Sequence, residues 1–248
     1  MKSLIIAASV VAAFSASAVA AEIKVMSAGA VEPGLVRVAE AFKKASGTEV
    51  KIQFNTAPQL AKKLADGETG DVLIAPPGLL DEQVKASRIS ADGRVMLGRV
   101  GAGVFVRADA TAPDIATTEA LKQAILGADS IVYNTASSGQ YIAKMIEKLG
   151  IAEQVKAKTT LYPDAAAVVA HVAKGKGKEI GFSPVPEIKM SEPKGVKLVG
   201  PLPADIQNYT SYGAAQMISS ASKDAAKAFL AYLATPEAKQ TLVSSGIE

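Results

Sequence analysis

The sequence predicts an α/β protein made of two lobes, each with a mostly parallel sheet flanked by helices. Two stretches of the chain alternate short strands with amphipathic helices, the pattern of units built on parallel strands. A long extended stretch interrupted by glycines, residues 95–109, separates them, and another extended segment, residues 209–218, follows the second. We expect these segments to be two hinge crossovers between the lobes. The predicted lobes are residues 22–102 with 208–248, and residues 103–207.

The first stretch reads as strand, helix, strand, helix, strand. Polar and apolar side chains alternate over residues 22–28 and again over residues 49–55, which predicts two strands. Apolar residues at helical spacing between them predict a helix that ends at Gly47. A second helix is expected to begin near Pro58, because the fixed φ of proline suits a first helical turn. The apolar run 71–75 predicts a buried parallel strand.

A helix is predicted at 79–86, before the extended stretch. A second α/β unit is predicted beyond that stretch. In chain order we expect a helix at 117–126, a strand at 130–134, a helix at 137–150, a strand at 158–163, a helix at 164–175 and strands at 179–183 and 196–200. After the return crossover, residues 222–246 predict two helices that break at Thr235-Pro236, since the residue before a proline disfavours helical geometry.

The N-terminus has the features of a cleavable signal peptide, predicted to cover residues 1–21. Lys2 precedes an apolar run from Leu4 to about Phe14, and small residues at 18–20 provide a cleavage site. The run is diluted by serines and is shorter than the roughly 20 apolar residues that a membrane-spanning helix needs. We therefore expect the mature chain to be secreted to the periplasm.

Composition narrows the classes of function. The chain has no cysteine, which excludes disulfides, thiolate metal sites and a lipidated N-terminus. Its 27 basic and 24 acidic residues are spread without a basic block, so we expect no nucleic-acid partner. There is no tryptophan and there are few aromatic residues, which argues against stacking on sugar rings. A small polar or anionic ligand fits this composition better.

No motif in the sequence predicts catalysis or a cofactor. There is no G-x-S-x-G elbow, no P-loop and no His-Glu metal motif. The single histidine, His171, is expected at the surface, and a metal site is not expected because no second histidine or cysteine ligand exists. Although related folds host catalysts, we expect a binding protein, without a cofactor or bound metal, rather than an enzyme.

Several strings in fixed order resemble the molybdate-binding family of periplasmic receptors, which have the type II periplasmic binding protein fold. The strings are residues 24–47, 59–75, 138–150, 177–182 and 228–248, the last reading AFLAYLATPEAKQTLVSSGIE. The resemblance covers the whole mature chain. It implies two α/β lobes that close on a small oxyanion such as molybdate or tungstate, a monomer, and delivery of the ligand to an ABC permease in the inner membrane.

The resemblance also implies where the ligand would bind. Family members use a serine after the first strand, which corresponds to Ala30 next to Gly29, and a serine before the second helix, which corresponds to Thr56-Ala57-Pro58. They use a backbone amide at the start of the long helix in the second lobe, which corresponds to Ser138. A tyrosine after the late strand corresponds to Pro184. From the residues themselves we add Ser137 and Gly139, which open a helix after the Asn134-Thr135 turn, and Ser183 beside the end of the late strand.

Two departures from the family pattern leave the ligand open. Ala30 and Pro184 lack the hydroxyl donors that the family has at these positions. Molybdate or tungstate is the leading expectation, and another oxyanion or a small carboxylate is the alternative. A receptor that feeds a sensor instead of a permease would have the same fold. Thr56, Ser137 and Ser138 are also ordinary helix-capping residues. Tyr209 and Tyr212, near the return crossover, are expected either to pack or to contact the ligand.

Overall fold

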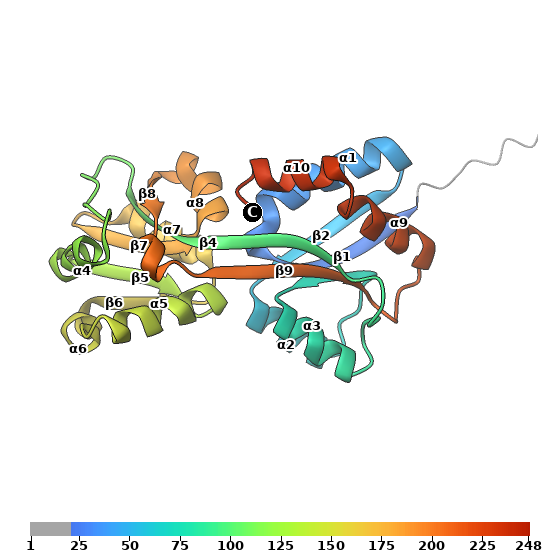
Figure 1. Cartoon of the computed structure of the whole chain (residues 1–248), viewed down its shortest axis with the longest axis horizontal. Coiled ribbons are helices and arrows are strands. Elements are labelled where there is room, and N and C mark those ends of the chain that lie inside the picture. Colours follow the sequence, from blue (N-terminus) through green and yellow to red (C-terminus); the bar gives the residue numbers. More distant parts are fainter. Residues whose placement is uncertain (1–20) are drawn as a thin grey trace, which may run out of the picture.

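The computed structural model describes residues 21–248. The predicted signal peptide, except for its last residue, lies outside this described part. The described chain forms two halves side by side (Figure 1). We call the half that contains the first three strands the first half and the other the second half.

The first half begins with three parallel strands. Strand β1 (Glu22–Ala28) pairs with both β2 (Glu49–Asn55) and β3 (Val72–Ala75). The intervening segments are the short 3-10 helix η1 (Gly29–Val31) and helices α1 (Glu32–Ser46), α2 (Ala57–Ala65) and α3 (Pro77–Lys85). Helix α1 ends as predicted at Gly47, which adopts the left-handed conformation with φ of 74° that glycine tolerates without strain.

The second half repeats the alternation around three parallel strands. Strand β5 (Ser130–Asn134) pairs with β6 (Thr159–Tyr162) and β7 (Glu179–Pro184). The other elements, in chain order, are α4 (Thr118–Gly127), α5 (Ser137–Lys148), α6 (Ala152–Val155), η2 (Lys156–Lys158), α7 (Ala165–Lys174), α8 (Val185–Ser191), η3 (Glu192–Lys194), β8 (Val196–Pro201) and η4 (Ala204–Ile206). Asp164 caps α7 by accepting a hydrogen bond from the Ala167 amide at 2.9 Å.

Two strands join the halves. Strand β4 (Val95–Arg107) pairs with β9 (Tyr209–Gln216) along its first part and with β7 and β8 along its second part, all antiparallel. One sheet path therefore runs through the molecule in the order β2-β1-β3-β9-β4-β7-β5-β6, with β8 on β4 (Figure 1). The α/β class is confirmed. The sheet is mixed rather than mostly parallel, because the two strands that link the halves run against their neighbours.

The buried apolar residues separate into clusters that follow the halves. One cluster contains residues of β1, β3, α1 and α2 together with the C-terminal helices α9 (Lys223–Leu233) and α10 (Pro236–Ser244). There the Phe42 ring packs on Phe229 and Tyr232, with centroids 5.2 and 5.4 Å apart. Replacing a buried phenylalanine such as Phe229 by alanine typically costs about 3 to 5 kcal/mol. Two further clusters lie in the second half.

The sequence pattern missed one helix that shapes the site. Helix α8 follows β7 directly, yet residues 185–191 hold two helix-unfavourable features, a β-branched start at Val185 and Pro186. Both lie in the first turn, where proline is tolerated because its missing N–H has no helical acceptor to lose. Helix α8 packs on η1 and α1 of the first half as well as on β4 and β8. Among residues 21–248, no helix is long and apolar enough to span a bilayer.

Candidate functional site

A cavity of about 410 Å³ lies between the two halves, at the carboxyl ends of four strands. Ala28 of β1, Asn55 of β2, Asn134 of β5 and Pro184 of β7 each end a strand, and all four line the cavity. Helices start at this edge of an α/β sheet, and their first N–H groups have no acceptor within the helix. Such an edge binds ligands, and anions in particular.

The wall from the first half offers mainly backbone donors. Gly29 and Ala30 line the cavity at the start of η1, where Ala28 before them provides no side-chain cap. The amides at this start are therefore not used by a capping side chain. Because Ala30 has no hydroxyl, a ligand here would be bound by N–H groups of the backbone.

The start of α2 completes this wall with a capping box. The Thr56 hydroxyl oxygen accepts a hydrogen bond from the Gln59 amide at 3.4 Å, and the Gln59 side chain accepts one from the Thr56 amide at 2.8 Å. Thr56 and Ala57 line the cavity, whereas Pro58 is exposed and does not. Accepting a hydrogen bond leaves the hydroxyl proton of Thr56 able to donate to a ligand, so capping and binding are compatible.

Asn55 carries a donor without an acceptor. Its Nδ2 atom is buried, and among the described residues no hydrogen-bond partner meets it. Leaving a buried polar group unpaired costs about 1 to 3 kcal/mol. Asn55 therefore brings an unsatisfied polar group to the cavity wall.

The wall from the second half presents hydroxyl groups at the start of α5. Ser137 and Ser138 line the cavity, and Ala136 before them gives α5 no side-chain cap. Gly139 is buried behind them. A Cβ atom there would lie 1.6 Å from the Asn134 carbonyl oxygen, so only glycine allows this close approach of helix and strand end. Gly139 thus shapes the turn without lining the cavity.

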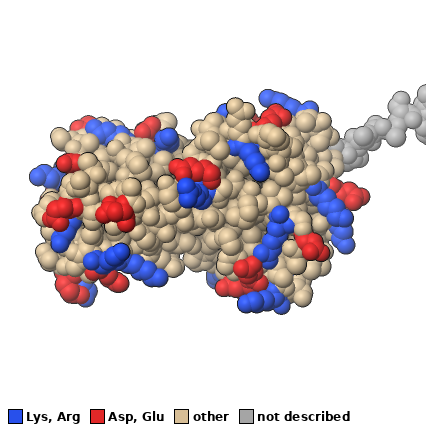
Figure 2. All heavy atoms as spheres, viewed as in Figure 1, with Lys and Arg blue, Asp and Glu red and all other residues tan. Residues whose placement is uncertain are grey.

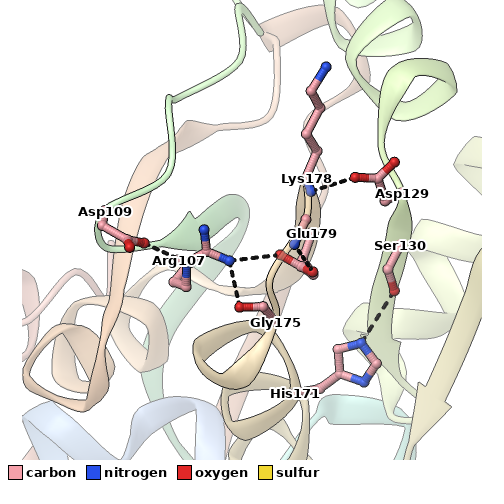
Figure 3. Close-up of polar contacts among 9 residues, drawn as sticks. Arg107, Asp109, Asp129, Ser130, His171, Gly175, Lys178 and Glu179 are labelled. Atoms are coloured by element: carbon pink, nitrogen blue, oxygen red, sulfur yellow. Dashed lines mark hydrogen bonds and ion pairs between the residues drawn. The ribbon is translucent and has the colours of Figure 1, made fainter.

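His171 and its neighbours belong to the interior of the second half rather than to the cavity lining. The expectation of a surface histidine is wrong, because the His171 ring is half-buried. Its Nδ1 lies 3.0 Å from the Tyr162 hydroxyl. Its Nε2 lies 3.3 Å from the Ser130 hydroxyl (Figure 3). Arg107 and Glu179 form an ion pair nearby in the same view. Within residues 21–248 no group of three metal-ligating side chains occurs.

The feature of the site that the sequence did not predict is Glu187 of α8. Glu187 lines the cavity, and its Oε2 accepts a hydrogen bond of 2.9 Å from the hydroxyl of Ser183, which is itself buried outside the cavity lining. The Glu187 side chain is half-buried at the cavity, and the protein atoms around its carboxyl group remove most of the water from it. This burial, with the negative charges of Glu32 and Asp164, raises the pKa of its carboxyl to about 7.

The other titratable groups of the cavity respond to the same environment. Burial raises the pKa of Glu32, although the positive charge of Lys194 opposes the shift. Burial and then the charge of Glu187 raise the pKa of Tyr212 well above its usual range, so its phenol is neutral. Tyr212 is buried and lines the cavity, so packing is confirmed for it and contact with the ligand stays a prediction. In the space-filling view, basic and acidic side chains are intermixed over the visible face (Figure 2).

The structure brings most of the sequence-predicted binding positions together around one cavity. Those that line it are Gly29, Ala30, Thr56, Ala57, Ser137, Ser138 and Pro184, while Pro58, Gly139 and Ser183 do not. Asn55 and Asn134 were missed, although each is the last residue of a predicted strand and could have been found by that position. No comparable signal identified Glu187, because it lies on a helix that the sequence pattern did not predict. That these residues bind a ligand stays a prediction.

Comparison with known proteins gives a family model and a relative. Residues 23–248 match the model described as bacterial extracellular solute-binding protein. A protein of Pseudomonas sp. named aconitate isomerase is 32% identical over 232 residues, which cover 90% of this chain and 86% of that protein.

Solved structures of low sequence identity share the fold. The periplasmic molybdate-binding protein of Azotobacter vinelandii aligns with a TM-score of 0.76 and 17% identity, over 91% of this chain and 98% of that one. The sulfate-binding protein of Mycobacterium tuberculosis aligns with a TM-score of 0.72 and 19% identity, over 91% and 86%. The fold expected from the family resemblance is confirmed.

Proposed function

Because this chain belongs to the bacterial extracellular solute-binding protein family, we propose that it captures a small anionic solute in the cavity between its halves. We further propose that it acts as a monomer in the periplasm and delivers the solute to an ABC permease. Ligand contacts with both walls would favour the arrangement in which the walls approach each other, which is a shift of population.

The observation that carries this proposal is the convergence of helix starts and hydroxyl groups on one cavity. The starts of η1, α2, α5 and α7 all line it, and partial positive charge accumulates at helix starts. The orphaned Asn55 Nδ2 adds a side-chain donor that needs an acceptor. Ser137 and Ser138 add hydroxyl donors from the opposite wall. Together these groups suit the oxygen atoms of an anion.

We propose a small di- or tricarboxylate as the ligand, ahead of a tetrahedral metal oxyanion. Molybdate and tungstate are the ligands implied by the family resemblance, yet Ala30 and Pro184 provide no hydroxyl, and Glu187 adds a carboxyl group. The cavity volume lies within the range of sites for organic ligands, about 300 to 1,000 Å³. The relative named aconitate isomerase points to the same chemical class, a tricarboxylate. Molybdate and tungstate remain the alternative ligands.

A thermal-shift screen of the mature protein tests the proposal. The ligands would be aconitate, tricarballylate, citrate, succinate, molybdate, tungstate and sulfate, each over a range of concentrations at pH 6 and pH 8. A ligand at 100 times its Kd stabilises the folded protein by about 2.7 kcal/mol. We expect the largest shift from a tricarboxylate. A shift from molybdate and tungstate alone would support the ligand that the family resemblance implies. The absence of a shift with every anion would contradict capture of an anion.

Substitution at Ser138 tests the location of the site. S138W places a large side chain in the cavity and should abolish the ligand-induced shift while the protein stays folded. The matched control is S219W, at an exposed serine outside the cavity lining, which should keep the shift. Equal ligand-induced shifts in both variants would mean that Ser138 is not part of the binding site. A30S, which supplies the missing hydroxyl, should raise molybdate affinity if the positional match to the family is correct.

Isomerisation of a tricarboxylate is a second candidate function, favoured by Glu187. A general acid or base works best with a pKa near the working pH, and the Glu187 carboxyl has a pKa of about 7 inside the cavity. Removing a proton from the methylene carbon of aconitate and returning it to the alkene carbon shifts the double bond and interconverts cis and trans forms. Proton NMR in D2O with aconitate would show isomerisation with deuterium incorporation, lost in E187Q. An unchanged spectrum with bound aconitate identifies a receptor.

A sensor-coupled receptor is the alternative use of the same cavity. If the chain serves a permease, its deletion should abolish uptake of the radiolabelled ligand identified by the screen. If it serves a sensor, deletion should leave uptake intact and abolish the transcriptional response to that ligand.

A further inference from the structure

Glu187 sits where the two halves meet at the cavity. Its helix, α8, belongs to the second half but packs on η1 and α1 of the first half. Ser183 occupies one carboxyl oxygen, Oε2, through the 2.9 Å hydrogen bond. The other oxygen, Oε1, faces the first half, because it would lie 3.3 Å from a Cβ atom added at Gly29. One oxygen of Glu187 therefore lies beside the amides that we propose bind the anion.

Charged residues from both halves line the cavity around Glu187. Glu32 at the start of α1 and Asp164 before α7 are acidic, and both also line the cavity. Lys194 of η3 is the basic residue of the lining and is exposed. Tyr212 of β9 contributes a neutral phenol. The lining thus combines three carboxyl groups with one ammonium group, an excess of negative charge that opposes a bare anion.

An anion held by the Gly29 amide would place an oxygen next to Glu187 Oε1. Two oxygens that are both acceptors repel each other, and the repulsion is strong where water is excluded. One proton between them converts the contact into a charge-assisted hydrogen bond, which is shorter and about twice as strong as a neutral one.

We propose that capture of the anion takes up one proton, which Glu187 shares with a ligand oxygen. This inference rests on the proposed function, since it assigns a specificity residue to the same cavity. It favours carboxylate ligands over the anions of strong acids such as sulfate, because a carboxylate binds a proton far more readily than sulfate does.

The pKa of Glu187 supports the proposed uptake of a proton. Burial raises the pKa of the carboxyl to about 7, and the charges of Glu32 and Asp164 act in the same direction, while the Ser183 hydrogen bond opposes them. In the unliganded protein at pH 8 most Glu187 side chains are therefore charged. Another negative charge from a bound anion raises this pKa further, so a proton has to enter with the ligand at pH 7 to 9.

Isothermal titration calorimetry of the mature protein with tricarballylate, which has no double bond to isomerise, tests the inference. Titrations at pH 8 in Tris and in triethanolamine, which differ in ionisation enthalpy, measure the number of protons taken up. We expect about one proton for the wild type and close to none for E187Q. With a free-state pKa of about 7, wild-type affinity should also fall about 50-fold from pH 7 to pH 9. E187Q reports the contribution of the ligand's own ionisation.

Two further variants keep the test decisive if E187Q does not fold or bind. S183A removes a hydrogen bond to the charged carboxyl and should move the midpoint of the pH dependence upward. E32Q removes a neighbouring negative charge and should move it downward. Binding without proton uptake, or midpoints that stay fixed in both variants, would overturn the inference alone. Failure of every anion to bind any variant between pH 5 and pH 9 would overturn the proposed function, and the inference with it.

Discussion

Two carboxylates inside this protein, one in each half, have opposite environments. Asp71 in the first half accepts hydrogen bonds from the Lys24 amide at 2.7 Å, the Ser220 hydroxyl at 2.7 Å and the Ser222 amide at 3.2 Å. Burial alone would raise the pKa of Asp71, but these hydrogen bonds together lower it. Glu187 in the second half accepts one side-chain hydrogen bond, from Ser183, and faces Glu32 and Asp164.

The difference shows how a structural carboxylate is distinguished from one available to a ligand. Asp71 joins the starts of β1 and β3 to the segment that precedes α9, and its charged form is stabilised by hydrogen-bond donors within the fold. Glu187 has an oxygen directed at the cavity and a charge that the fold does not compensate. Buried carboxyl groups of this second kind cluster at functional sites.

The largest effect is expected from D71N. The amide nitrogen of asparagine cannot accept hydrogen bonds, so at least one buried donor loses its partner, and we expect a loss of about 3 kcal/mol of unfolding free energy at pH 7. Because the folded pKa of Asp71 is below its unfolded value, the contribution is present above that unfolded value and is lost as pH falls through the folded pKa. Urea unfolding from pH 7 to pH 2 measures this. If D71N is as stable as the wild type at pH 7, Asp71 does not have the structural role described.

E187Q should change stability in the opposite direction. The folded pKa of Glu187, about 7, lies above the ordinary pKa of a glutamate carboxyl, 4.5, so the wild type loses stability as pH rises between these values. Glutamine keeps the shape without the charge, so we expect E187Q to be more stable by about 2 kcal/mol at pH 8 and equal to the wild type at pH 4. Urea unfolding of the unliganded proteins measures both. Destabilisation at pH 8 would mean that the fold needs the Glu187 charge.

The two serines that donate to these carboxylates provide a matched pair of substitutions. S220A removes a buried hydroxyl that donates to a permanently charged group, for which we expect a loss of about 1.5 kcal/mol at pH 7. The loss should become smaller in acid as Asp71 takes up a proton. Thermal unfolding at pH 7 and pH 3 would show it, and an equal loss at both pH values would contradict a charge-assisted bond.

S183A is expected to have the smallest effect. At pH 6 Glu187 is mostly protonated and the lost bond is close to a neutral one, so we expect a loss of about 0.5 kcal/mol. At pH 8 the loss should approach 1 kcal/mol, because the carboxyl is then charged. A loss at pH 8 as large as that of S220A would mean that the two carboxylates are equally dependent on their serine donors, which would end the distinction between them.

The sequence predicted the elements of the fold well because most carry a strong local pattern. Residues 22–28 and 49–55 alternate in polarity and form β1 and β2 over those ranges, and Gly47 ends α1. Helix α8 was missed because it is only seven residues long and contains a proline. Its helical state is stabilised by packing on η1, α1 and β4, segments more than 70 residues away along the chain, which no local pattern reports.

For the candidate site, the sequence by itself determined which chain segments could offer donors. Gly29 and Thr56 each lie between a predicted strand and a predicted helix, and Ser138 lies in the first turn of the helix after another strand. That order alone places helix starts at a common sheet edge. Only the tertiary structure decided which of these groups remain available and what faces them. It buried Gly139 against Asn134, left Asn55 Nδ2 without an acceptor and placed Glu187 between the halves. Hydrogen-bond satisfaction and carboxyl ionisation depend on neighbours that are distant in sequence, which is why local pattern could not provide them.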